Sequence, residues 1–473
     1  MNSIAVSLSV GLLVVPLLVV LTRRYPIISV GIVIGLVCFS AHVLALLYSA
    51  GAPAWMVRGL IPVKDWIALT VAVTLALSRR EPARRLLWLL SAVIVPVVFG
   101  CVIALLRPHH VPLEALISSA RDLMVAPIGM TIAFLLTTGE RDRVRRIGAV
   151  VVGFAAAWGL IEYVAPWSLV THIVAVGRYW ADVKGQPQFL VNIPGAGLLP
   201  GNFTTNPYVI GATRRLVGPF GDPLTAGVLC AVGLVWSLTS FRNARVWVVP
   251  ALASGTALLL SFTRAGWLLA AAAIIPMVIA RAHRAFQGDT RKVALVLGVG
   301  LAALTTVVLA LPFTRTYLIA MATGRSSSTN GHLAALRQLG SQNYSVVGGG
   351  VGTAGAIVDL GTESAAATVL LQLGLVGGAI YLGSCLALLG KGKSRWDPGV
   401  AQLLVVLVLV FSSWFSSEQW LTFNSGLPTA MFAVLGGSLT DTPISVKRLL
   451  GAVGGLGGVG AAAQSSRARR LLR

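Results

Sequence analysis

Residues 4–49 read IAVSLSVGLLVVPLLVVLTRRYPIISVGIVIGLVCFSAHVLALLYS, which is two apolar runs, 4–21 and 26–49, divided by Arg23 and Arg24. Each run comes close to the ~20 residues that a helix needs to cross the hydrocarbon core of a bilayer. No basic segment precedes the first run, and no small-residue cleavage pattern precedes Arg23, so a signal anchor is the weaker reading. We therefore predict that the chain begins with two membrane-spanning helices.

The composition extends this prediction to the whole chain. Of the 473 residues, 56% are hydrophobic and only 11% are charged, and the mean hydropathy is +0.84. Soluble domains carry about a quarter charged residues, so a water-soluble globular fold is excluded. The apolar runs are continuous and lack the alternation of barrel strands, which predicts an all-α, polytopic bundle of transmembrane helices.

The net charge of +22 is explained by where the basic residues fall. Most of them lie in seven short clusters between apolar runs, and these alternate with loops poor in cations. This is the positive-inside pattern, and it assigns the clusters to the cytoplasm without any need for nucleic acid. The clusters are 23–24, 79–85, 141–146, 242–245, 281–292, 391–395 and 447–473.

The apolar segments between the clusters predict about 12 or 13 spans, with the N-terminus outside and the C-terminus inside. The membrane domain is predicted to cover residues 1–440, and 441–473 to form a basic, Gly/Ala-rich cytoplasmic tail. The predicted spans are 4–21, 26–49, 63–78, 86–106, 115–137, 147–165, 222–240, 247–262, 265–280, 294–311, 364–389, 400–418 and 426–440.

Two loops predicted on the outer face, 166–221 and 312–363, are much longer than the others. Long loops in a compact bundle are usually functional. The first ends in Arg214 and Arg215, followed by a turn-rich stretch to Gly227. A guanidinium there suits phosphate oxygens, and the alternative is a pair of ordinary cations facing lipid headgroups.

Arg264 lies in the turn Ser261–Trp267, which interrupts a continuous apolar stretch between two cytoplasmic clusters. The stretch therefore predicts two spans joined by a tight outer hairpin, with Arg264 at or just within the outer surface. A charge at this depth usually marks a ligand or a pathway. Snorkelling of the side chain to lipid phosphates is the alternative.

The second long loop carries Arg325, His332 and Arg337, then a glycine run at 348–350, and ends at Glu363. Glycines allow close approach to a ligand or a sharp reversal of the chain. Glu363 precedes an apolar helix, where a carboxylate is stabilised by the helix dipole and could act as a general base. A plain helix-start acid is the alternative for Glu363, and we expect His332 to be structural.

Some further residues bear on function. Arg121 and Asp122 lie within a predicted span, where Arg121 either joins a phosphate pocket or pairs with another helix. Being adjacent, they are expected to point to different sides of the helix and not to pair with each other. Glu162 and Glu418 are expected to be interfacial. The four cysteines lack metal-ligand spacing and are expected to be buried thiols, and no metal site is predicted.

Taken in order, these motifs resemble the O-antigen ligase and Wzy-type polymerase superfamily over roughly residues 115–440. The shared features are an Arg-x-x-Gly-x-Phe-x-x-Pro stretch from Arg215 to Pro223, a Ser-x-x-Arg-x-Gly hairpin from Ser261 to Gly266, and a Gly-Arg…Gly-x-Gly loop from Gly324 to Gly352. The resemblance implies a bacterial cytoplasmic membrane protein with an extracytoplasmic active face. Its expected substrate is glycan linked to undecaprenyl diphosphate, handled without nucleotide, cofactor or essential metal.

The resemblance also implies roles for individual residues. Arg215 and Arg264 would hold the diphosphate, with Arg214, Arg325, Arg337 and Arg121 as further contributors. Ligases of the superfamily typically carry a histidine as the base after the glycine loop, whereas this chain has Glu363 and Ser364 there, which favours a polymerase over a ligase. The implied partners are membrane lipids and other envelope polysaccharide assembly proteins such as a flippase and a chain-length regulator, and no nucleic acid.

Two other classes stay open. A glycosyltransferase that uses polyprenyl-phosphate sugars would carry paired acids in the first outer loop, but residues 50–62 hold none and only Asp65 follows. A transporter or flippase would show internal repeats and helices broken at mid-membrane. No repeat is visible in the sequence, so a transporter ranks lowest.

Overall fold

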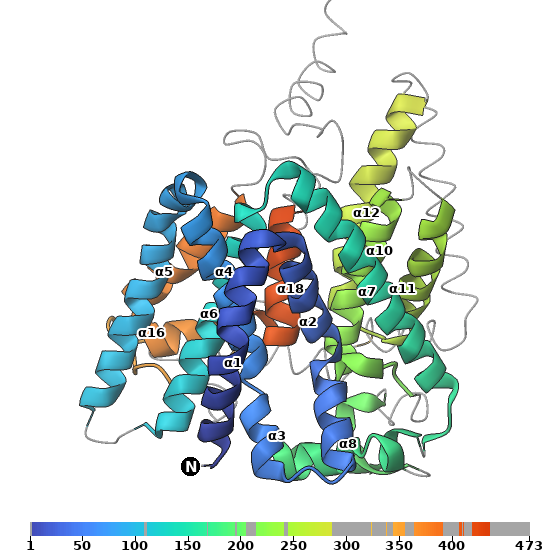
Figure 1. The fold of residues 1–473 in the computed structure, drawn as a ribbon, viewed down its shortest axis with the longest axis horizontal. Helices are drawn as coiled ribbons and strands as arrows, with labels where there is room; N and C mark the ends of the chain where they lie inside the picture. The colour runs from blue at the N-terminus through green and yellow to red at the C-terminus, as the bar shows by residue number, and fades with distance from the viewer. Residues whose placement is uncertain are drawn as a thin grey trace, which may run out of the picture.

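The fold is known from a computed structural model. It describes residues 2–107, 111–167, 169–193, 196–204, 214–240, 245–285, 323, 337, 344–354, 364–390, 406–408, 410 and 419–435. Most of the described residues are helical, which confirms the predicted all-α fold class. The ribbon in Figure 1 shows long helices running between two ends of the molecule.

Eight helices in the described part of the chain are long and apolar enough to cross a membrane, so this is a multi-pass membrane protein. Two shorter apolar helical segments, Val248–Leu260 (α11) and Arg264–Ile275 (the first part of α12), coincide with the predicted hairpin around Arg264. The predicted spans at 294–311 and most of 400–418 lie outside the described residues, so the full count stays a prediction. The main helices are α1 (Asn2–Arg24), α2 (Pro26–Ser49), α3 (Ala54–Leu60), α4 (Val63–Ser78), α5 (Arg80–Leu106), α6 (Leu113–Leu135), α7 (Thr138–Val164), α10 (Pro223–Ser240), α11 (Val248–Leu260), α12 (Arg264–Ala285), α16 (Ala365–Gly390) and α18 (Phe423–Leu435).

The start of α7 differs from the prediction. The span was expected to begin at residue 147, but the helix begins at Thr138. Thr137 and Glu140 form a capping box at its N-terminus, and Glu140 also pairs with Arg79 at 2.5 Å. Side-chain acceptors at this position satisfy the first backbone N–H groups of a helix. The basic cluster at 141–146 is therefore helical and does not form a loop.

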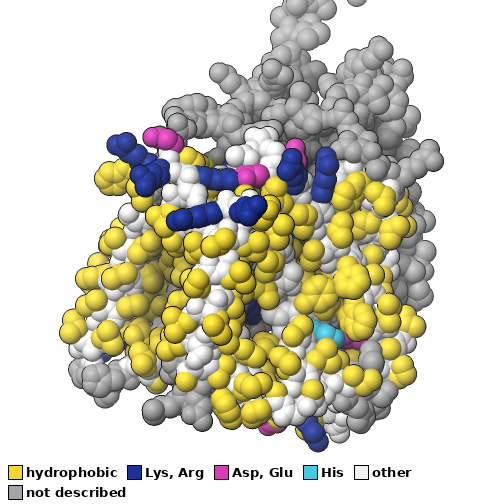
Figure 2. Space-filling view, in the orientation of Figure 1, with side chains coloured by type: hydrophobic (Ala, Val, Ile, Leu, Met, Phe, Trp, Pro, Cys, Tyr) yellow, Lys and Arg dark blue, Asp and Glu magenta, His cyan; other side chains and the backbone are white. Residues whose placement is uncertain are grey.

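Basic side chains gather at one end of the molecule, while the rest of the visible face is largely hydrophobic (Figure 2). Arg24 ends α1, Arg79 joins α4 to α5, Arg80 begins α5, and Arg141 lies in the first turn of α7. We call this the basic end, and the positive-inside pattern predicts that it is cytoplasmic. The other is called the opposite end and is predicted to be extracytoplasmic.

Small residues allow the helices to pack closely. A Cβ added at Gly129 of α6 would lie 2.5 Å from the Leu427 carbonyl oxygen of α18. A Cβ at Gly148 of α7 would lie 2.2 Å from the ring of Trp236 of α10. Since lipid tails are as apolar as the helix surfaces, close van der Waals packing is a main source of helix association in membranes.

The described residues of the loop predicted at 166–221 form short helices and strands. Its short elements pack across the opposite end, where Figure 1 places α3 and α8. A two-stranded antiparallel hairpin pairs Leu190 with Pro200, and an isolated bridge joins Thr204 to Arg214. The elements are η1 (Leu169–Ile173), α8 (Val176–Arg178), η2 (Tyr179–Val183), η3 (Pro187–Phe189), β1 (Leu190–Ile193), β2 (Gly197–Pro200), η4 (Gly201–Phe203) and η5 (Gly218–Phe220).

The predicted span at 364–389 is not a continuous helix. At Gly374 the backbone adopts φ 77° and ψ 175°, so α16 consists of two helical pieces joined at this residue. The glycine-rich segment 344–354 lies against the break: the N–H of Gly349 donates to the Leu371 carbonyl, and the N–H of Leu375 donates to the Ser345 carbonyl. These bonds satisfy backbone groups that the broken helix leaves unpaired, which membrane-embedded backbone requires.

Candidate functional site

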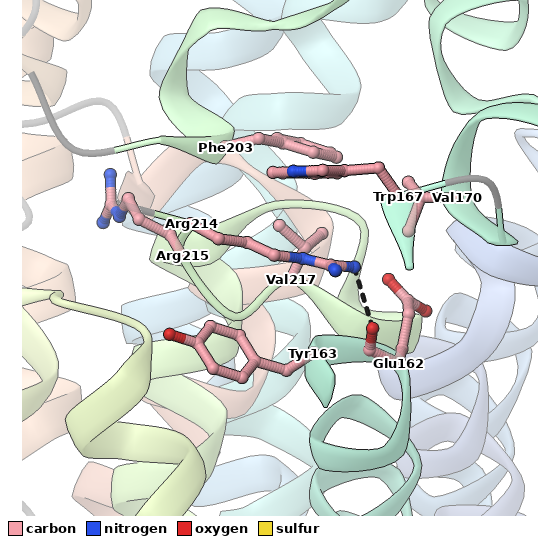
Figure 3. Close-up of a pocket in the computed structure, with 8 residues that line it drawn as sticks. All are labelled: Glu162, Tyr163, Trp167, Val170, Phe203, Arg214, Arg215 and Val217. Carbon is pink, nitrogen blue, oxygen red and sulfur yellow. Dashed lines mark hydrogen bonds between the residues drawn. The ribbon is translucent and has the colours of Figure 1, made fainter. Parts of the chain in front are cut away.

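The site lies at the opposite end, where three segments meet. These are the C-terminal end of α7, residues 214–221 before α10, and the turn 261–263 between α11 and α12. A pocket there is lined by side chains from the first two segments and from the folded loop (Figure 3). Its lining residues are Glu162, Tyr163, Trp167, Val170, Phe203, Arg214, Arg215 and Val217.

Arg214 caps the C-terminus of α7. Its Nη1 donates to the Ala165 carbonyl at 2.6 Å and its Nη2 donates to the Glu162 carbonyl at 2.8 Å. The last carbonyls of a helix have no partner within the helix and carry partial negative charge, so a cation is stabilised there. The guanidinium also lies 4.1 Å from the ring centre of Trp167, and Figure 3 shows the two groups side by side. Partial burial lowers the pKa of Arg214, while Glu162 and Tyr163 oppose this shift.

Arg215 is bound to the turn between α11 and α12. Its Nε donates to the Ser261 carbonyl at 2.9 Å, its Nη2 to Thr263 Oγ1 at 3.2 Å, and its Nη1 to the Asn202 carbonyl at 3.2 Å. These acceptors are neutral, so they fix the guanidinium without cancelling its charge. The same turn holds Phe262 at a positive φ of 51°, which is uncommon for a residue with a side chain.

Two of the predicted motifs are thus brought together. The N–H of Leu216 donates to the Leu260 carbonyl at 2.9 Å, and Thr263 Oγ1 donates to the Pro223 carbonyl at 2.7 Å. The turn that carries Arg264 therefore packs against the segment that carries Arg215. Arg264 is the first residue of α12 and is half-buried.

Of the remaining predicted site residues, Arg121 and Arg337 lie within the part of the chain that the structure describes. Arg121 donates to Asp122 at 2.6 Å and lies 3.8 Å from Asp65 of α4, so the expectation that Arg121 and Asp122 cannot pair is wrong. Their side chains bend toward each other because opposite charges in a partly buried position attract each other. Arg337 is exposed, but its sequence neighbours lie outside the described residues, as do Arg325, His332 and Glu363. Their roles stay predictions.

The surroundings of Glu162 differ from the prediction. It was expected to be interfacial, but its side chain is only 6% exposed, and Oε2 has no hydrogen-bond partner among the described residues. His42 of α2 lies on the other side of this carboxylate, with Nδ1 3.9 Å from Oε2. The signal was present in the sequence as two ionisable residues in apolar spans, but their proximity depends on how α2 packs against α7.

A cavity of about 20 Å³ adjoins Glu162 on the His42 side. Lys184 of the folded loop lines it, with Nζ 3.6 Å from the ring centre of Trp180. Burial lowers the pKa of Lys184 to about 8, although Asp222 opposes the shift. Glu162 lines both this cavity and the arginine pocket. It therefore lies between one space lined by arginine side chains and another lined by Lys184.

Within the part of the chain that the structure describes, no three histidine, cysteine or acidic side chains are grouped to hold a metal ion. Cys38, Cys230 and Cys385 are buried, as predicted, and Cys101 is half-buried. A comparison with protein families, curated proteins and solved structures finds no match for this chain.

Proposed function

We propose that this protein is an integral membrane glycosyl transferase that polymerises, or transfers, undecaprenyl-diphosphate-linked glycan at the outer face of the bacterial cytoplasmic membrane. A polymerase is favoured over a ligase. The observation that supports the proposal is the contact between the Arg215 segment and the Arg264 turn at the end opposite the basic clusters. These are the two motifs that the sequence resemblance assigns to diphosphate binding.

The chemistry of the reaction explains why fixed cations matter. When the glycosidic bond to the lipid breaks, negative charge develops on the diphosphate leaving group. Donors that are already held in place stabilise this charge without the energetic cost of reorganisation. Arg215 is held by the carbonyls of Asn202 and Ser261, and Arg214 by those of Glu162 and Ala165. Arg264 begins the helix that follows the same turn.

The base that the resemblance implies is Glu363, which opens the stretch leading into α16. Polymerisation would need a base to remove a proton from the acceptor hydroxyl as it attacks the anomeric carbon. In this proposal, partners are the lipid-linked glycan, membrane lipids and assembly proteins such as a flippase and a chain-length regulator. Neither nucleotide nor metal takes part.

A transporter is the second candidate, because α16 is broken at Gly374. Discontinuous membrane helices, with irregular backbone at membrane depth, are typical of substrate sites in secondary transporters. The sequence alone did not reveal this break. Among the described features, the break is the one that favours transport over glycosyl transfer.

The test is the length of lipid-linked glycan extracted from cells that lack the protein. Accumulation of single repeat units supports a polymerase, whereas accumulation of full-length lipid-linked polymer supports a ligase. Unchanged lipid-linked glycans contradict both and favour the transporter. Cells complemented with Arg264→Lys should make about 10²-fold less product than cells complemented with the wild-type protein. The reason is that the single charged atom of a lysine does not replace the planar, bidentate guanidinium of an arginine. Arg178→Lys, at an exposed arginine of the same end, is the matched control.

A further inference from the structure

Glu162 has the burial and the surroundings of a reactive acid. Its side chain is 6% exposed and that of His42 is 9% exposed, although both lie in helices of a bundle that faces lipid. Burying a carboxylate without hydrogen bonds to both oxygens is unfavourable. Buried groups that keep an unused acceptor therefore require an explanation, and a proton or a substrate hydroxyl would supply the missing donor.

The position of Glu162 connects it to the arginine site. The Arg214 guanidinium, which caps α7, donates to the backbone carbonyl of Glu162 itself at 2.8 Å. Figure 3 shows the Glu162 carboxylate next to the end of the Arg214 side chain, with Arg215 in the same pocket lining. The carboxylate thus lines the pocket that would hold the diphosphate.

The other side of Glu162 offers a route for a proton. His42 Nδ1 lies 3.9 Å from Oε2, and the cavity of about 20 Å³ beyond it has room for one water-sized group. A direct hydrogen bond needs a shorter distance, so a proton would pass from carboxylate to imidazole through a small movement or a bridging group.

We propose that Glu162, in place of Glu363, is the base that accepts the proton of the acceptor hydroxyl, and that His42 shares this proton. This inference rests on the proposed glycosyl transfer. The O–H bond of the acceptor breaks and its proton goes to Glu162. The acceptor oxygen forms a bond to the anomeric carbon, and the bond from that carbon to the diphosphate oxygen breaks. The electron pair of that bond leaves with the diphosphate, whose charge Arg215 and Arg264 stabilise.

The test uses the purified full chain with lipid-linked repeat units and compares Glu162→Gln with wild type. We expect turnover to fall by about 10²-fold to 10⁴-fold, which is the usual contribution of a general base. Donor binding should stay within twofold, because the amide keeps the shape of the side chain. Glu162→Asp should retain part of the turnover. Glu81→Gln is the control, since Glu81 is an exposed acid at the basic end.

The pH dependence separates a base from a structural acid. In wild type, turnover should fall at low pH as Glu162 becomes protonated, and His42→Gln should move the midpoint of this fall. In Glu162→Gln, the residual turnover should not show this fall at low pH. The other charged or titratable groups that line the two spaces beside Glu162 are Tyr163, Tyr179, Lys184, Arg214 and Arg215, with Asp222 acting on Lys184.

Three outcomes would overturn the inference. One is full turnover in Glu162→Gln, especially if Glu363→Gln abolishes turnover, and this would leave the proposed function intact. Another is an equal loss of turnover and donor binding in Glu162→Gln, which would make Glu162 structural. The third is a wild-type protein that extends no lipid-linked glycan, and this alone would remove the proposed function as well.

Discussion

At the scale of single residues, Arg215 links its own segment to residues 202–203 of the folded loop and to the more distant turn after α11. Its guanidinium donates to carbonyls of Asn202, Ser261 and Phe262, while its own backbone N–H donates to the Phe203 carbonyl. An arginine provides five N–H donors in a fixed plane, whereas a lysine provides three from a single atom. The geometry of the site therefore depends on the side chain, and its charge alone would not reproduce that geometry.

Arg215→Lys should destabilise the turn between α11 and α12 while preserving the net charge. We expect the free energy of unfolding to fall by about 2 kcal/mol, which is typical for the loss of hydrogen bonds to a charged group. Thermal unfolding of the detergent-solubilised chain measures this loss. Arg178→Lys should leave the transition unchanged, because Arg178 is exposed. Equal shifts in the two variants would contradict the structural role of Arg215.

Lys184 should titrate far below an ordinary lysine. Below pH 8 it is charged in both the folded and the unfolded chain. As the pH rises through about 8, the folded chain loses the proton first, while the unfolded chain keeps it until about pH 10.4. The unfolded state then binds more protons, so stability should rise with pH across this window.

Acylation of Lys184, followed by mass spectrometry over a pH series, measures its pKa directly. We expect a midpoint near pH 8. Lys184→Met should abolish the rise in stability between about pH 8 and 10.4, because no proton is then lost at this position. A midpoint near 10 would show that the side chain is solvated and does not pack against Trp180.

At the scale of elements, the break in α16 depends on glycine. Gly374 has φ 77°, and a Cβ there would lie 2.4 Å from the Val346 carbonyl oxygen. The facing residue Gly348 has φ 84°, and its Cβ would lie 2.3 Å from the Gly374 nitrogen. Two glycines therefore allow the segment 344–354 to approach the broken helix.

Gly374→Ala should destabilise the protein by more than the ~1–3 kcal/mol that a backbone conformation restricted to glycine costs another residue, because the added carbon also collides with backbone. Gly383→Ala lies in the same helix with open space around it and should be neutral or slightly stabilising. Thermal unfolding of both variants gives the comparison. If Gly374→Ala is as stable as Gly383→Ala, the break is not needed for folding.

Several element boundaries were predictable and others were not. The ends of α2 match the predicted span because Pro26 suits the first turn of a helix and the basic residues of the first cluster precede it. The start of α7 was missed because charged residues were assigned to a loop, although the capping box Thr137 to Glu140 was visible in the sequence. The break at Gly374 was missed because the helix is apolar on both sides of it.

At the scale of the whole molecule, the distribution of charge predicts orientation. A cysteine at Gln188, exposed in the folded loop, should react with a membrane-impermeant maleimide in intact cells. A cysteine at Thr138, exposed at the basic end, should react only after the membrane is permeabilised. The wild-type chain gives the background from its native cysteines. The opposite labelling pattern would invert the topology and remove the site from the outer face.

The sequence by itself determined that this is an α-helical, multi-pass membrane protein. Its apolar runs are long and continuous, and in a bilayer such runs can satisfy their backbone hydrogen bonds only as helices. It also predicted Arg214, Arg215 and Arg264 as candidate ligand-binding residues, because charges at the ends of apolar spans are costly to place near the membrane. Only the tertiary structure decided which of them lie together, that Glu162 lines the same pocket as Arg214 and Arg215, and that His42 lies beside Glu162. These contacts link α2 to α7 and Arg215 to the turn at 261–263. They depend on how the helices pack, and this packing relies on the close approach of small residues from different helices. A local sequence pattern does not reveal which helices approach each other in this way.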